Sequence, residues 1–245
     1  MIFIAVFVPA LIFALYQVRV KREAYSAEQD AIEASRLWNI RMLSGKPSPV
    51  IMFKSVSKRW VINDDYSTDY RETLEIEAVK GDIDAYAMRF FADENAKPIP
   101  FLKKHGLKVR VGNSLVNPVV FDDTDWKKSV AVLFPHPIKE GQSETVTYDI
   151  NWPGYWNSLQ GGKPDEATWY TVHDCEDATL TVVFPSKVKR REDVSMDVYP
   201  REKGRNGQFI IDELTDRVAY MLKMKNPEKG DDKVYKLHFN IELHA

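Results

Sequence analysis

The sequence contains a single cysteine, Cys175, among its 245 residues. One thiol excludes an intramolecular disulfide framework, and it fits a protein that works in a reducing compartment. A zinc site would need about four ligands at recognisable spacing, yet no second Cys/His pair accompanies His173 and Cys175. We therefore expect neither disulfide bonds nor a bound metal.

The chain also lacks the short motifs that mark common catalytic sites. It contains no GxxxxGKS/T, GxGxxG, GxSxG or HExxH, which removes the usual phosphate-loop, dinucleotide, hydrolase-elbow and zincin interpretations. A strong basic excess is missing too, since the formal net charge is -2 and the pI about 6.2. Proteins that bind nucleic acid usually carry such an excess. We expect no cofactor and no nucleic-acid partner.

Charged residues are absent from the first 18 positions, MIFIAVFVPALIFALYQV. A helix of that length spans roughly 27 Å, slightly less than the hydrocarbon core of about 30 Å. Arg19 and Lys21 can reach the headgroups with their long side chains. We therefore expect residues 1–20 to form a transmembrane anchor that contacts the bilayer through residues 1–18. Arg19, Lys21 and Arg22 follow the apolar run, and positive flanks stay in the cytoplasm, which predicts a cytoplasmic C-terminal domain.

Three other interpretations of the apolar segment remain open. A secretory signal would carry positive charge before the run and small residues after it, and neither is present. A buried core helix would fit the short length. A helix lying in the membrane plane would need a polar face, which the segment lacks. A single spanning helix agrees best with the distribution of charge.

Residues 21–46 have the composition of a helical stalk. Neither proline nor glycine occurs from Lys21 to Ser44, and helix formers dominate. Acidic residues come early, whereas Arg36 and Arg41 come late, an order that suits the helix dipole. Packing on the chain's own domain is the simpler expectation for its weak apolar stripe, and self-association is the alternative.

From residue 47 onward the hydrophobic period changes from helical to two. In TDYRETLEIEA, for example, Tyr70, Leu74 and Ile76 fall on one face, and Arg71 and Thr73 on the other. Many short strands separated by turn residues predict a mainly β domain over 47–245, an antiparallel β-sandwich. The similar segments SVAVLFPHPIK and TLTVVFPSKVK leave open two immunoglobulin-like halves. Proline ending a buried strand explains the similarity equally well.

An aromatic stretch, NWPGYWNSLQGGKPDEATWYTV, surrounds a glycine-rich loop. Aromatic rings supply large contact areas and suit the recognition of a partner or ligand. The competing interpretation places Trp152 and Trp169 in the core. The predicted ligand- or partner-binding residues are Trp152, Tyr155, Trp156, Trp169, Tyr170 and His173.

The polar cluster His173-Asp174-Cys175-Glu176-Asp177 permits a second hypothesis. A cysteine nucleophile needs a base beside it. His173 and Cys175 are two positions apart, so on a strand their side chains would lie on the same face. A hydrolase that depends on this thiol or histidine is therefore an alternative, although an acidic turn before a strand explains the cluster more simply.

These patterns favour a non-catalytic, membrane-anchored binding or sensor module. In this interpretation the β domain recognises a protein partner or a small ligand, and it can cluster its membrane helix by self-association. The alternatives are the hydrolase centred on His173 and Cys175, and a structural subunit of a membrane complex.

Overall fold

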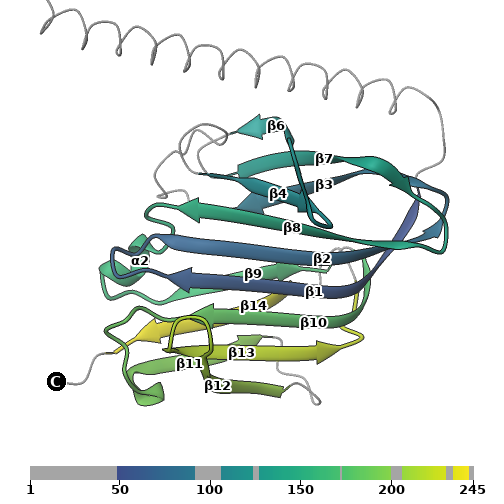
Figure 1. Ribbon diagram of the computed structural model, residues 1–245. Coiled ribbons are helices and arrows are strands. Elements are labelled where there is room, and N and C mark those ends of the chain that lie inside the picture. Colours follow the sequence, from purple (N-terminus) through teal and green to yellow (C-terminus); the bar gives the residue numbers. More distant parts are fainter. Residues whose placement is uncertain are drawn as a thin grey trace, which may run out of the picture.

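The computed structural model shows a mainly β protein, as predicted (Figure 1). The predicted anchor, residues 1–20, and the predicted stalk, residues 21–46, lie outside the described residues. In the part of the chain that is described, no helix has the length and apolar character needed to cross a membrane. The described residues are 49–91, 106–123, 127–171, 173–199, 206–229 and 234–242.

The largest element is an eight-stranded sheet in which long strands alternate buried and exposed side chains. Its strands lie in the order β12-β13-β10-β1-β2-β8-β4-β5. Their bounds are β1 Val50–Ile62, β2 Thr68–Lys80, β4 Lys108–Val111, β5 Ser114–Val116, β8 Ser143–Trp152, β10 Asp174–Val183, β12 Asn206–Asp212 and β13 Arg217–Lys225.

One strand pair departs from the predicted antiparallel arrangement. β1 and β10 run parallel, with Met52 opposite Asp174 and Val61 opposite Val183. The alternation of apolar and polar residues sets which face a strand buries, but it contains no information on direction. Parallel neighbours need a long connection between them, and here the described residues form eight strands, β2 to β9, between β1 and β10.

The described residues also form two three-stranded sheets. Sheet order is β11-β14-β9 in one and β3-β7-β6 in the other. A short helix, α2, and a 3-10 turn, η1, lie in the connections. The bounds are β3 Ile83–Phe91, β6 Val119–Asp123, β7 Lys127–Ile138, α2 Asn157–Gln160, β9 Asp165–Tyr170, η1 Arg191–Asp193, β11 Val194–Tyr199 and β14 Val234–Ile241.

Both small sheets pack against the same buried face of the large sheet. The ring of Phe90 in β3 lies 6.0 Å from that of Tyr70 in β2, and Phe239 in β14 lies 5.5 Å from Phe184, directly after β10. A single hydrophobic cluster joins buried residues of all three sheets. In Figure 1, β9 and β14 run behind the large sheet, while β3, β7 and β6 occupy its other end.

The predicted alternation along individual strands is confirmed. In β2, Tyr70, Leu74 and Ile76 are buried and Arg71 is exposed. In β14, Tyr235, Leu237 and Phe239 are buried, and His238 faces solvent.

The two segments of similar sequence do not occupy equivalent positions. The segment from Ser129 lies in β7, the central strand of a three-stranded sheet. The segment from Thr179 lies in β10, between β13 and β1 of the large sheet. Their common pattern therefore reflects buried strands near a proline rather than matching places in two repeated halves.

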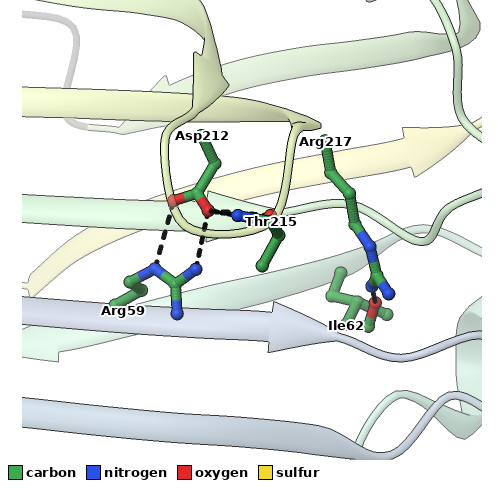
Figure 2. Close-up of polar contacts among 5 residues, drawn as sticks. All are labelled: Arg59, Ile62, Asp212, Thr215 and Arg217. Atoms are coloured by element: carbon green, nitrogen blue, oxygen red, sulfur yellow. Dashed lines mark hydrogen bonds and ion pairs between the residues drawn. The ribbon is translucent and has the colours of Figure 1, made fainter.

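The hairpin between β12 and β13 is fastened to β1 by a polar latch (Figure 2). Arg59 donates from Nε to Asp212 Oδ1 at 3.2 Å and from Nη2 to Oδ2 at 2.8 Å. Thr215 donates to the same carboxylate from its backbone N–H at 3.0 Å and from its hydroxyl at 2.7 Å. Arg217 reaches the carbonyl of Ile62 at 3.4 Å. These bonds connect the β12–β13 hairpin to β1.

Candidate functional site

A cavity of about 700 Å³ lies between the large sheet and the strands β3 and β9. Its volume falls in the range of small-molecule sites, which is roughly 300–1,000 Å³. Besides the ring of His173, nine aromatic side chains line it: Phe53, Trp60, Tyr70, Tyr86, Phe90, Trp152, Tyr155, Trp169 and Tyr170. Polar and charged side chains are interspersed among these rings.

The floor of the cavity comes from inward-facing positions on β1 and β2. Trp60 lies directly opposite Tyr70, and Lys58 directly opposite Glu72, in the antiparallel register of the two strands. The rings of Trp60 and Tyr70 are 5.4 Å apart. Because side chains alternate across a strand, Lys58 and Glu72 share the apolar face with these two rings.

Lys58 and Glu72 form an ion pair in this apolar floor. Lys58 Nζ lies 3.2 Å from Glu72 Oε1, and the two side chains are 14% and 4% exposed. The hydroxyl of Tyr70 donates to the other carboxylate oxygen of Glu72. Burial raises the pKa of Tyr70, and the charge of Glu72 and its hydrogen bond raise it further, so the phenol remains a donor. Buried charges are tolerated where they are paired and hydrogen-bonded in this way.

Five of the six predicted binding residues line the cavity: Trp152, Tyr155, Trp169, Tyr170 and His173. Trp152 and Trp169 are also almost fully buried, so they serve as core and as cavity wall. Trp156 is completely buried and is not part of the lining. Its ring packs 4.7 Å from Tyr155 and 5.4 Å from Phe239. Trp156 therefore supports the wall of the cavity from behind.

His173 lies among aromatic rings. Its imidazole is 5.2 Å from the ring of Phe53 in an edge-on arrangement and 6.3 Å from that of Tyr86. Burial lowers its pKa, and the charge of Lys229 lowers it further against the opposing effect of Asp174. At neutral pH the imidazole is therefore uncharged, and it offers one donor and one acceptor nitrogen.

Cys175 does not have the surroundings of a nucleophile. Its thiol donates to the backbone carbonyl of Asp177 at 3.2 Å. Burial, the largest cause, raises its pKa to about 12. Reactive cysteines need a lowered pKa because the thiolate is the nucleophile. The contacts of this thiol therefore give the hydrolase hypothesis no support.

We expect Cys175 to resist alkylation in the folded protein. At pH 8 a thiol with a pKa near 12 holds about one part thiolate in 10⁴. Incubation with iodoacetamide, followed by mass spectrometry, should leave the native chain unmodified while the urea-unfolded chain reacts fully. Rapid labelling of the native chain would contradict this assignment and return the thiol to the list of candidate nucleophiles.

The ion pair at the floor escaped the sequence-based prediction of the site. A signal for it is present, because Glu72 falls in phase with Tyr70 and Leu74 on the buried face of β2. Lys58 falls in the same way between Val56 and Trp60 on β1. A single charge in phase with an apolar face marks a position that needs a buried partner.

No metal centre accompanies the cavity in the described part of the chain. Within those residues, no group of three or more His, Cys, Asp or Glu side chains could hold a metal ion. The charged and polar side chains that line the cavity are Lys58, Glu72, Arg89, Asp165, Glu166, Thr168 and His173.

Comparison with known proteins yields solved structures of similar fold but no family. No protein-family model and no curated protein matches the chain. A candidate protease from Parabacteroides distasonis is 13% identical with a TM-score of 0.50; the match covers 77% of this chain and 40% of that one. An M1 zinc metallopeptidase from Deinococcus radiodurans is 9% identical with a TM-score of 0.48, and the match covers 78% of this chain and 42% of that one. Yeast LTA4 hydrolase is 9% identical with a TM-score of 0.43, and the match covers 77% of this chain and 29% of that one.

This chain spans less than half the length of each of these solved structures. At 13% identity, the likeness to the Parabacteroides protein concerns the fold alone. The activities in these names belong to those proteins.

Proposed function

We propose that this chain is a non-catalytic binding module, built as a β-sandwich, whose cavity receives a small ligand or part of a protein partner. The observation that supports this proposal is the cavity itself: about 700 Å³, walled by aromatic rings. Ligand sites are typically concave, mostly apolar and equipped with a few placed polar groups. The Lys58–Glu72 pair and the neutral imidazole of His173 supply such groups here.

Binding is favoured over catalysis by the chemistry of the lining. The thiol of Cys175 is not part of the lining, and it donates to a backbone carbonyl and stays protonated. Glu72 is occupied by Lys58 and Tyr70. Covalent catalysis in contrast combines a nucleophile with a base that can take its proton. Aromatic walls with a few placed polar groups suit recognition.

The binding proposal can be tested with the full chain in detergent. A ligand at 100 times its Kd adds about 2.7 kcal/mol of stability, which corresponds to about 5–10 °C in the melting temperature of a domain of this size. Thermal-shift screening of a metabolite library should find such a ligand. Because Trp60, Trp152 and Trp169 all line the cavity, the same ligand should change the intrinsic tryptophan fluorescence.

A variant in which a larger side chain occupies part of the cavity provides the control for ligand binding. Ala87 is exposed and lines the cavity, so Ala87→Trp should block binding without disturbing the core. The matched variant Ser195→Trp places the same ring on exposed β11 and should bind normally. Equal binding by both variants would show that the ligand sits elsewhere and would remove the basis of the proposal.

In this proposal the first 18 residues anchor the module in a bilayer, with the β domain on the cytoplasmic side. Support comes from the uncharged run and from Arg19, Lys21 and Arg22 after it. The full chain should pellet with membranes after lysis and resist alkaline carbonate extraction, whereas a chain lacking residues 1–20 should not pellet. Recovery of the full chain in the supernatant would contradict the anchor.

Signalling through the anchor would need one further property. A ligand shifts the association of the membrane helices only if it binds the associated state more tightly than the separate chains. Sizing of the full chain in detergent with and without ligand measures this difference.

A further inference from the structure

The carboxylates that line the cavity already accept from donors of the protein itself. Glu72 is paired with Lys58 in the floor. On β9, Asp165 accepts from the backbone N–H of Glu166 at 2.8 Å, and Glu166 is paired with Lys236 at 2.7 Å. A ligand that offered only donors would therefore have to compete with bonds that the protein has already made.

Several donors of the lining are in the opposite situation. The indole N–H groups of Trp60 and Trp169 and the hydroxyl of Tyr86 have no hydrogen-bond partner among the described residues. The ammonium of Lys58 carries three N–H groups, and within that part of the chain its one polar contact is with Glu72. Trp60 and Trp169 are each only 3% exposed. Donors that are buried to this degree need an acceptor from water or from a ligand.

The charges in the floor oppose a charged ligand of either sign. A cation would be attracted to the faces of the rings, but it would be repelled by the ammonium of Lys58 in the same floor. An anion that approached Lys58 would meet the carboxylate of Glu72, which lies 3.2 Å from that ammonium. The pair is neutral as a whole, and an additional buried charge without its own partner is costly. Uncharged acceptors therefore suit this floor best.

The walls of the cavity suit an aromatic body. Trp60 and Tyr70 in the floor are 5.4 Å apart, and Trp169 in the wall is held in place by stacking on Tyr235 at 5.6 Å. Aromatic rings pack favourably on one another in offset or edge-on arrangements. A flat ring system can therefore replace the water of the cavity with ring contacts, provided that its polar atoms replace the hydrogen bonds of that water.

We propose that the ligand is an uncharged aromatic ring system that carries carbonyl or ether oxygens, and that these oxygens accept hydrogen bonds from Lys58 and Trp60. The two side chains are two positions apart on β1 and share its inward face. This inference rests on the proposed function and names the class of ligand for the same site. It joins the two properties of the lining, which are its many rings and its unused donors.

The test uses the full chain in detergent and four probes of matched shape: methyl naphthyl ketone, ethylnaphthalene, naphthoate and naphthylmethylammonium, all substituted at the same ring carbon. Isothermal titration calorimetry gives the affinity of each probe, and the same titration of Ala87→Trp corrects for uptake by the micelles. The ketone should bind most tightly of the four. It differs from ethylnaphthalene only by its oxygen, so the ratio of these two affinities measures the hydrogen bond.

Variants of the floor identify the donors. In Lys58→Met/Glu72→Leu the preference for the ketone over ethylnaphthalene should fall about tenfold or more, the effect of losing a hydrogen bond to a charged group. Comparing the ratio between wild type and variant cancels the partition of the probes into detergent. Trp60→Phe keeps a ring but removes one N–H, and it should lower the preference about threefold. Arg89→Gln at the exposed side of the cavity and Ser195→Trp on β11 should leave it unchanged.

Circular dichroism and the melting temperature confirm that each variant folds. If the double variant does not fold, Trp60→Phe alone decides the outcome. Tightest binding of naphthoate or of naphthylmethylammonium would overturn the inference. An equal preference for the ketone in wild type and in the folded floor variants would overturn it too.

Failure of this inference and failure of the proposed function give different results. If none of the four probes binds, the metabolites found by thermal shift decide. An uncharged aromatic oxygen compound whose affinity falls in the floor variants would support the inference. Any other metabolite that is blocked by Ala87→Trp would overturn the inference and leave the binding module intact. Absence of any binding metabolite or probe would overturn both.

Discussion

Replacing Glu72 with alanine is expected to lower the free energy of unfolding by about 3–5 kcal/mol, the usual cost of removing one partner from a buried ion pair. The substitution leaves the ammonium of Lys58 in an aromatic floor, where its side chain is 14% exposed. It also removes the acceptor of the Tyr70 hydroxyl. A largely buried charge and a buried donor would both lose their partners.

The double variant Lys58→Met/Glu72→Leu is the informative control. Replacing both members of a buried pair with apolar residues of similar size is often neutral or stabilising. Urea denaturation should therefore rank the double variant above Glu72→Ala and above Lys58→Met alone, and a double-mutant cycle gives the coupling energy. Stability losses that simply add would contradict a direct interaction. If the double variant is stable but no longer binds ligand, the pair is retained for recognition.

The second large effect is expected at Asp212, the centre of the latch between β1 and the β12–β13 hairpin. Asp212→Asn should lower the free energy of unfolding by about 2–3 kcal/mol, since hydrogen bonds to charged groups contribute about 1.5–3 kcal/mol. The carboxylate is 9% exposed and accepts two bonds from Arg59. An amide can keep one of these contacts but cannot accept both.

The contribution of Asp212 should depend on pH in a defined direction. Burial alone would raise the pKa of this carboxyl, but the bonds from Arg59 and Thr215 outweigh it and hold the pKa below its ordinary value of 3.8. A lowered folded-state pKa stabilises the protein above the unfolded pKa, and this stabilisation is lost as the pH falls through the folded pKa. The difference between wild type and Asp212→Asn should be constant at neutral pH and shrink below about pH 4. Urea melts from pH 7 to pH 3 measure it, and a difference that grows on acidification would exclude this account.

Period-two patterns predicted the local structure well because burial of one face is a local property of a strand. The alternation in β2 and β14 appears in the fold as the sequence indicates. Strand direction and sheet order depend on contacts between residues far apart, and no local pattern contains them. The parallel pairing of β1 with β10 is the example. The prediction of a membrane anchor concerns residues 1–20, outside the described residues, and stays a prediction.

The composition of the aromatic stretch indicated a binding site, but it did not show where the aromatic residues would lie in the fold. Trp152 and Trp169 were expected either in the core or at a binding surface, and they lie in both, since the cavity is bounded by the core itself. The other rings of the site, such as Phe53 and Tyr86, come from β1 and β3, remote in sequence. Only the tertiary fold brings them to the stretch, so no spacing rule could have included them.

The parallel pairing of β1 with β10 has a consequence for biosynthesis. The residues that meet in this pair are 122 positions apart, as Lys54 and Glu176 show. A ribosome working at about 5–20 residues per second needs roughly 6–24 s to produce that stretch. During this interval one edge of β1 has no neighbour, although β2 already covers the other. We expect nascent chains that stop before β10 to be held by chaperones or to aggregate, and those that extend past β13 to be released.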